Sequence, residues 1–213
     1  MEEKTHSHIE SAISKRKAGE IVFLADFRGK GTQAAIKKAM SRLAKAGRLK
    51  RLAHGIYYIP KTDPVLGELR PDVDEVVKIL AHKERIRVRP AGAYALHQLG
   101  LTTQVPMKRV YLTDGSSRQF RLGKMLVRFK ATSPKKLSTT GKISSLVIQA
   151  IEEMGVDQIS PELEKKLLEF LRKEEPRKLK HDLALASAKV NDYIVRLMKK
   201  NITENDRVAQ INA

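Results

Sequence analysis

The sequence of 213 residues predicts an α+β fold, on two observations. Apolar residues recur at helical spacing near both ends of the chain. Between these parts, the segments 85–90, 108–113, 118–122 and 125–130 have strand-like composition and are separated by short turns or a helix. Because strands and helices do not alternate regularly, we expect α+β rather than parallel βαβ units.

Composition narrows the function classes. The chain carries a net charge of +18 and has no cysteine, which excludes disulfides, Cys-ligated zinc and thiol catalysis. No apolar run approaches the roughly 20 residues that span a bilayer, and the polar start MEEKTHSHIE is not a secretory signal. We therefore expect a soluble cytoplasmic protein, without membrane partners, that binds a polyanion.

The first elements are two short helical segments. Ser7–Lys17 is expected to be a helix because Ile9, Ala12 and Ile13 share one face. Gly19 ends it, and the apolar stretch Glu20–Phe23 leads into a brief turn or helix at 24–27.

A basic helix follows a glycine-rich turn. The turn Arg28-Gly-Lys-Gly-Thr32 ends on a threonine suited to cap the next helix. In Gln33–Ala46, Ile36, Met40 and Leu43 lie at helical spacing, and Gly47 ends the helix. We expect this apolar face to pack on the first helix and on Phe23.

After Gly47 the spacing of apolar residues changes from the helical period to an alternating one. Arg48–Leu52 alternates, 53–55 is a turn, and Ile56–Ile59 is rich in β-formers before Pro60. The order of helix, short helix, turn, basic helix and hairpin predicts an N-terminal winged helix-turn-helix. Tyr57 and Tyr58 could stack on bases, but one of two adjacent strand residues normally faces the core, so we expect one of them to be structural.

Positive charge is concentrated in this segment. From Phe27 to Thr62 there are ten basic residues and no acidic one, whereas ordinary surfaces mix both signs. We therefore predict a double-stranded DNA site, in which the helix reads the major groove and the hairpin contacts phosphates. The candidate DNA-binding residues are Arg28, Lys30, Thr32, Gln33, Lys37, Lys38, Ser41, Arg42, Arg48, Lys50, Arg51 and His54.

The remaining chain predicts two further regions. Asp63-Pro64 begins a linker, 65–82 is partly helical, and a central α+β domain with a small antiparallel sheet ends in a helix at Ser144–Met154. A C-terminal helical pair follows at Pro161–Lys173 and Lys178–Lys200. The predicted domains are 1–62, 63–159 and 160–200, with 201–213 as a flexible tail.

Two patterns leave alternatives open. Arg85, Arg87 and Arg89 alternate, so they either bind phosphate or form the solvent face of a sheet. The apolar stripe of the last helix is either core or a groove for a partner, with core packing the more frequent case. It comprises Leu183, Ala186, Val190, Tyr193, Ile194 and Leu197.

Catalytic and metal signals are weak. Gly29-Lys-Gly-Thr32 lacks the spacing of a phosphate-binding loop, and His6 and His8 have no apparent third metal ligand. No G-x-S-x-G elbow and no pair of carboxylates at a two-metal spacing occurs. We therefore expect no enzyme activity, no catalytic residue, no metal and no cofactor.

Longer motifs carry a family resemblance. Leu43-Ala-Lys-Ala-Gly-Arg-Leu49 precedes Gly55-Ile-Tyr-Tyr-Ile-Pro60. More distinctive are PAGAYALHQLGLTTQVP at 90–106, VYLTDG at 110–115 and VRFK at 127–130. Over about residues 7–155 the chain resembles the AbiEi-like antitoxins of type IV toxin–antitoxin systems, in particular a DUF6088-like branch of unknown function.

The resemblance implies a winged helix that binds promoter DNA and represses its own operon. It also implies a second domain for antitoxin action against a nucleotidyltransferase-like toxin encoded nearby. Two other classes stay open from the residues alone. They are an RNA-binding or ribosome-associated basic protein and a protein-interaction module with incidental charge.

Overall fold

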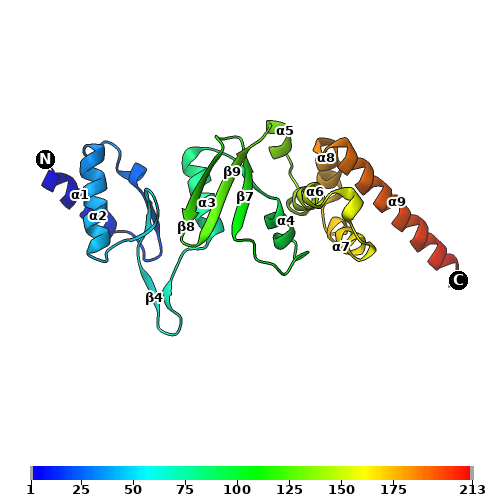
Figure 1. Ribbon diagram of the computed structural model, residues 1–213, viewed down its shortest axis with the longest axis horizontal. Coiled ribbons are helices and arrows are strands. Elements are labelled where there is room, and N and C mark those ends of the chain that lie inside the picture. Colours follow the sequence, from blue (N-terminus) through cyan, green and yellow to red (C-terminus); the bar gives the residue numbers. More distant parts are fainter. Residues whose placement is uncertain (1, 212–213) are drawn as a thin grey trace. The chain divides into compact units, whose positions relative to one another are not determined.

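The computed structural model describes the backbone of residues 2–211 and the side chains of residues 3–200. Its architecture is mixed α/β, with helices at both ends of the chain and small sheets between them (Figure 1). The chain divides into two compact units, residues 1–84 with 120–125 and residues 85–119 with 126–213.

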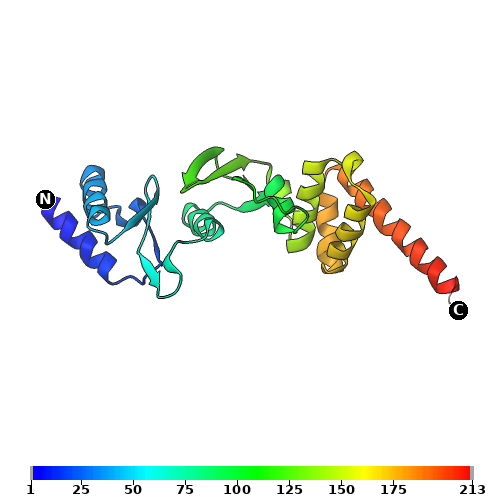
Figure 2. The same cartoon turned by 60° about the horizontal axis from the view of Figure 1, so that its bottom comes forward.

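The first unit starts with helix α1 (Glu2–Ser14), strand β1 (Ile21–Phe23) and a 3-10 helix, η1 (Leu24–Phe27). Helix α2 (Gln33–Lys45) follows, and Figure 2 shows α1 and α2 running at a clear angle to each other. Strands β2 (Lys50–Ala53) and β3 (Ile56–Tyr58) then form a hairpin. The three strands make an antiparallel sheet in the order β1-β3-β2.

Helix α1 lies earlier in the chain than the expected range Ser7–Lys17. Its buried face includes Thr5, one turn before Ile9, and the Thr5 hydroxyl donates a hydrogen bond of 3.2 Å to the Lys30 carbonyl. Because threonine is not counted among the apolar residues, the sequence pattern misses this buried position and places the helix start too late.

The core of the first unit lies between α1, α2 and the sheet. Ile36, Met40 and Leu43 of α2 are buried in one cluster with Ile9 and Ile13 of α1. The predicted packing of α2 on the first helix is confirmed. The phenylalanine that joins this cluster is Phe27 of η1, whereas Phe23 is buried outside it.

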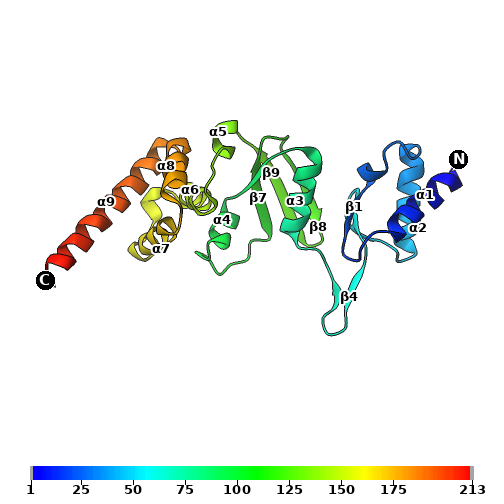
Figure 3. The same ribbon diagram turned by 180° about the vertical axis from the view of Figure 1, so that it is seen from behind.

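The segment expected to be a linker at Asp63-Pro64 is instead the turn of a second hairpin. Strands β4 (Lys61–Asp63) and β5 (Gly67–Leu69) pair antiparallel. The hairpin projects from the rest of its unit, as Figure 3 also shows from behind. Helix α3 (Val73–Glu84) then begins after Asp72, whose carboxylate accepts the Asp74 amide hydrogen at 2.7 Å. Because residues 61–69 form the hairpin, the helix does not extend back to 65.

The second unit contains strands β6 (Val88–Ala91), β7 (Lys108–Thr113) and β9 (Met125–Ala131), and helix α4 (Ala93–Gln98). Strand β8 (Arg118–Leu122) completes a sheet of order β6-β7-β9-β8. The expected antiparallel sheet is wrong in one respect, because β7 pairs parallel with β9. The chain leaves β7, forms β8 at the edge and returns through the Gly123 turn, which brings β9 beside β7 in the same direction.

The three alternating arginines do not form one row. Arg85 adopts a left-handed conformation with φ 55° before the strand starts. Arg87 donates to the Asp114 carboxylate at 2.8 Å, and Arg89 donates to the Thr139 carbonyl oxygen. Two of the three side chains therefore hold the second unit together, and the residues do not present a common phosphate-binding face.

The C-terminal region has three helices rather than the expected pair. After α5 (Pro134–Leu137), α6 (Lys142–Met154) and η2 (Val156–Gln158) come α7 (Pro161–Arg172), α8 (Pro176–Leu185) and α9 (Ala188–Ile211). The break follows Leu185, where Ala186 is extended and the Asn191 side-chain amide donates to the Leu183 carbonyl at 2.7 Å. The segment predicted to be a flexible tail is helical as far as Ile211.

The apolar stripe of these helices is core. Leu183, Val190, Ile194 and Leu197 are buried in one cluster with residues of α6 and α7, such as Leu167. Of the two interpretations of the stripe, core packing is confirmed.

A buried carboxylate ties α8 to the start of α6. Asp182 is inaccessible to solvent and accepts hydrogen bonds from the amides of Thr140 (2.7 Å) and Gly141 (2.8 Å) and from the hydroxyl of Ser144 (2.5 Å). Burial raises the pKa of Asp182, but hydrogen bonds from Ser144, His181 and the two amides outweigh it and hold the pKa below its usual value.

Candidate nucleic-acid interface

The turn before α2 is fixed by contacts within the first unit. Thr32 caps the helix, with its hydroxyl oxygen accepting the Ala35 amide hydrogen at 3.2 Å. Thr5 of α1 binds the Lys30 carbonyl, and a Cβ atom on Gly31 would lie 2.4 Å from the Thr5 hydroxyl oxygen. Glycine is needed here because α1 and the turn pack so closely. The N-terminal end of α2 is therefore held in one place.

Helix α2 separates its residues cleanly into two faces. The buried face carries Ala35, Ile36, Ala39, Met40 and Leu43. The side chains expected to contact DNA all lie on the exposed face, together with Ala34. This exposed stripe comprises Gln33, Lys37, Lys38, Ser41, Arg42 and Lys45.

Lys45 belongs to this stripe, although the sequence pattern did not single it out. It lies in the last turn of α2, three residues after Arg42 and four after Ser41. Those two spacings place it on the same face as both residues. Extending the helical spacing by one more step would have found it from the sequence.

The remaining candidate residues flank α2 on both sides. Arg28 and Lys30 are exposed in the preceding turn, and Arg48, Lys50, Arg51 and His54 are exposed on the β2–β3 hairpin. Among the residues that the structure describes, several of the cations form no ion pair. These are Arg28, Lys30, Lys37, Arg42 and Arg48.

Two hairpin residues are held by other groups of the chain. The guanidinium of Arg51 donates to the Ala53 carbonyl at 3.3 Å and contacts the His54 ring at 3.3 Å. The Lys50 ammonium pairs with the Glu68 carboxylate of β5 at 2.5 Å. No sequence pattern indicated Glu68 as a partner, because this pairing depends on the unpredicted β4–β5 hairpin.

Neither tyrosine of β3 is available to stack on bases. Tyr57 is buried in the core cluster, and Tyr58 is buried with its hydroxyl donating to the Glu68 carboxylate. Burial, together with that hydrogen bond, raises the pKa of Tyr58 to about 12. Glu68 has a lowered pKa because Lys50 and Tyr58 both donate to its carboxylate. One tyrosine was expected to be structural, and the structure buries both.

Asp26, which directly precedes the basic stretch, is paired with other cations. Asp26 of η1 pairs with Arg16 at 3.4 Å and with Lys83 of α3. Its side chain is only 9% exposed, so its charge is directed into the unit. Asp26 is therefore not a counter-charge for the exposed stripe of α2.

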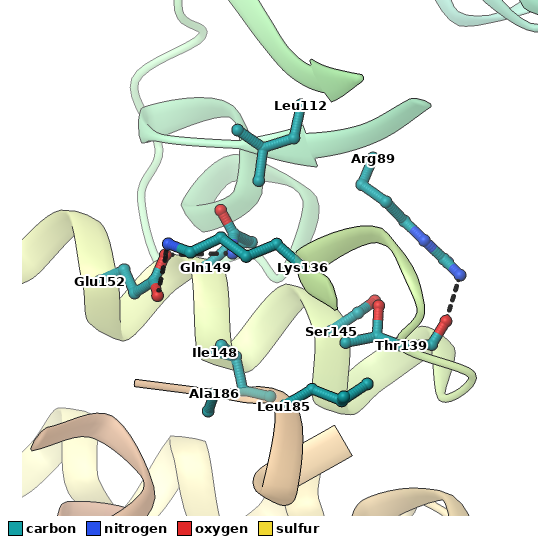
Figure 4. A pocket seen from close by; sticks show the side chains of 10 residues that line it. All are labelled: Arg89, Leu112, Lys136, Thr139, Ser145, Ile148, Gln149, Glu152, Leu185 and Ala186. Carbon is teal, nitrogen blue, oxygen red and sulfur yellow. Dashed lines mark hydrogen bonds and ion pairs between the residues drawn. The ribbon is translucent and has the colours of Figure 1, made fainter. Parts of the chain in front are cut away.

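The second unit contains a small pocket between β6, β7, α5, α6 and the end of α8. Figure 4 shows Arg89 reaching the Thr139 carbonyl on one side, while Lys136 pairs with Glu152 at 3.0 Å on the other. The cavity volume is about 10 Å³, roughly the minimum needed to hold one water molecule. This pocket does not accommodate a substrate-sized ligand.

The described part of the chain offers neither a metal-binding cluster nor a membrane-spanning helix. Over the region of the chain that the structure describes, no group of three or more His, Asp or Glu side chains could hold a metal ion. Within the same residues, no helix combines the length and apolar character that crossing a membrane requires.

The sequence matches a protein-family model. Residues 8–179 match the family of unknown function DUF6088. The chain belongs to the DUF6088 family. The matched segment starts in α1 and ends in α8, so the family pattern covers both the exposed stripe of α2 and the sheet of the second unit. No curated protein matches the chain.

Proposed function

We propose that this DUF6088 protein is a DNA-binding transcriptional regulator whose N-terminal region is a winged helix-turn-helix. The observation that carries the proposal is the exposed stripe of α2, where cationic and amide side chains lie opposite a face that is buried throughout. A capped helix with this division presents its polar side chains on one side of an ordered backbone, as the recognition helix of a helix-turn-helix does.

The dimensions of α2 suit the major groove. Its 13 residues extend about 20 Å at ~1.5 Å per residue, and the groove is about 12 Å wide. Gln33 and Lys37 lie in the first two turns, the portion of such a helix that sits deepest. Glutamine pairs with adenine through two hydrogen bonds and lysine binds guanine, so these two side chains read sequence.

The flanking cations contact phosphates in this proposal. Arg28 and Lys30 precede the helix, and Arg48 and Arg51 lie on the β2–β3 hairpin, which forms the wing. Phosphate contacts fix the register of a protein on the duplex without reading its sequence. They also make the affinity depend steeply on salt.

The resemblance to AbiEi-like antitoxins supports a more specific role. In that role the protein binds the promoter of its own operon in the cytoplasm and represses it, and the second unit contacts a nucleotidyltransferase-like toxin encoded nearby. The proposal assigns the chain no catalytic step and no cofactor.

Retention of labelled nucleic acids by the full chain tests the DNA assignment. Three probes are compared at equal salt: the DNA upstream of its own gene, a shuffled duplex of the same composition, and a structured RNA. We expect the upstream duplex to be retained most tightly. Preferential retention of the RNA would overturn the proposal in favour of an RNA-binding protein. Copurification with the product of the neighbouring gene tests the antitoxin role separately.

A further inference from the structure

The tip of the β4–β5 hairpin exposes aliphatic side chains that the DNA site so far described does not use. Val65 is 90% and Leu66 75% exposed, and the neighbouring Pro64 is also exposed. Burying a side chain of this size is worth about 1.5–3 kcal/mol. An exposed aliphatic pair at the end of a projecting hairpin therefore suggests a contact that forms on binding.

The tip has a fixed conformation. The Asp63 carboxylate accepts the amide hydrogens of Val65 at 2.8 Å and Leu66 at 2.9 Å. These two hydrogen bonds lower the pKa of Asp63, so the turn is held by a carboxylate that stays ionised. Gly67 closes the turn with φ 71°, a conformation that favours glycine. The two aliphatic side chains are presented in place before any partner arrives.

The base of the hairpin is joined to the basic β2–β3 hairpin. Glu68 of β5 binds both Lys50 of β2 and Tyr58 of β3. Strand β5 continues past Glu68 only to Gly67, which pairs with Asp63, and the three-residue turn 64–66 then carries Val65 and Leu66 at the end of the hairpin. Beside the Lys50–Glu68 ion pair, the exposed cations Lys61 and Arg70 lie at the base of the hairpin.

Size and charge together favour DNA over a protein as the occupant. A stable protein interface buries about 800 Å² on each partner, far more than the tip supplies. A wedge in the minor groove needs only one or two apolar side chains, often leucine or proline, which separate adjacent base pairs and kink the duplex. The phosphate rims of the minor groove, which is about 6 Å wide, suit the cations at the base of a narrow hairpin.

We propose that the β4–β5 hairpin is a second DNA arm, which inserts Val65 and Leu66 into the minor groove next to the site read by α2 and bends the duplex. This inference rests on the proposed function, because it needs a duplex already held by α2. The bend goes beyond the proposed function, because α2 can read the major groove and the wing can contact phosphates on a straight duplex.

Energy transfer across a bent duplex tests the arm. The probe is a duplex of about 30 base pairs from the upstream region, with a donor and an acceptor dye at its two ends. Wild type should bring the ends closer. The double variant Val65→Ser with Leu66→Ser keeps both turn amides and every cation, so it should lose the bend and bind about tenfold more weakly, with little change in the salt dependence.

A matched control comes from the second unit. Val105 and Met107 are 61% and 65% exposed, and Val105→Ser with Met107→Ser should change neither the bend nor the affinity. If the tip variant binds and bends the duplex like wild type, the arm is wrong and the proposed function stands. If wild type binds the duplex but leaves it straight, the arm is again wrong. Absence of any duplex binding by wild type overturns both.

Discussion

Tyr58 and Glu68 join two neighbouring hairpins through a hydrogen bond from the buried phenol to the carboxylate. The same carboxylate pairs with Lys50, a residue expected to contact phosphate. Glu68 therefore has two effects at once. It anchors the β4–β5 hairpin, and it neutralises one cation at the edge of the candidate DNA interface.

Glu68→Gln should strengthen DNA binding. Glutamine still accepts the Tyr58 hydrogen bond but leaves the charge of Lys50 free for a phosphate. One additional phosphate contact changes the slope of log K against log salt by about −0.9. Binding isotherms at several salt concentrations measure this slope.

Glu75→Gln is the matched control for this substitution. Glu75 is exposed on α3, and replacing it by glutamine changes the net charge by the same amount as Glu68→Gln without affecting Lys50. An identical gain in both variants would mean that overall charge, rather than the release of Lys50, determines the affinity.

Asp182→Asn should destabilise the second unit. Each carboxylate oxygen accepts a backbone amide hydrogen, one from Thr140 and the other from Gly141, so the NH₂ of asparagine faces an N–H donor whichever way it turns. Each buried donor left without an acceptor costs about 1–3 kcal/mol. Urea unfolding gives the loss, and Asp192→Asn, at an exposed position on α9, should leave the stability nearly unchanged.

The same carboxylate should make the free energy of unfolding depend on pH in the acidic range. Because the pKa of Asp182 is lower in the folded protein than in the unfolded chain, its contribution is present above the ordinary aspartate pKa of about 3.9. That contribution is lost as pH falls from there through the folded value. Asp182→Asn should remove this component of the acid dependence, and a profile identical to wild type would contradict the role given to Asp182.

The part of the candidate site formed by α2 and the β2–β3 hairpin was predictable, because it depends on the spacing of apolar residues within each element. Helical spacing predicted which face of α2 is buried, and the change of period after Gly47 predicted the β2–β3 hairpin. The start of α1 was not predictable, because it depends on buried Thr5 contacting a carbonyl 25 residues away. Local spacing carries no information on such a contact.

The β4–β5 hairpin and the direction of β9 were missed for different reasons. Asp63-Pro64 is a turn signal in a linker and in a hairpin alike, and the pairing of Glu68 with Lys50 becomes visible only in three dimensions. Strand composition predicts that β9 exists but not which neighbour it pairs with. Its parallel pairing with β7 follows from the edge position of β8.

Arg48→Ala with Arg51→Ala should weaken binding to all duplexes by about the same factor. Both side chains are exposed on β2 and its approach, where phosphate contacts position the protein without reading bases. The slope of log K against log salt should become shallower by roughly 0.9 for each phosphate that the variant no longer neutralises. Titrations with upstream and shuffled duplexes measure both effects, and a loss confined to the upstream duplex would show that the hairpin reads sequence.

Met40→Ala should lower the stability of the first unit through a core cavity. Met40 is inaccessible to solvent between α1 and α2, and truncating a buried methionine costs about 2–5 kcal/mol. Ser41→Ala, one residue along on the exposed face, should leave thermal unfolding nearly unchanged. Equal effects of the two substitutions would contradict the division of α2 into a buried and an exposed face.

Gln33→Ala and Lys37→Ala should each reduce specificity more than affinity. The two residues lie one turn apart on the exposed face, at the end of α2 that the Thr32 cap and the Thr5 contact hold in place. A good base contact is worth about 1–3 kcal/mol of discrimination, so each substitution should lower the ratio of upstream to shuffled binding by roughly tenfold. Lys45→Ala, in the last turn of the same face, should weaken both duplexes alike. Unchanged ratios for both Gln33→Ala and Lys37→Ala would mean that α2 does not read bases, and an RNA-binding role would then account better for the charge of this helix.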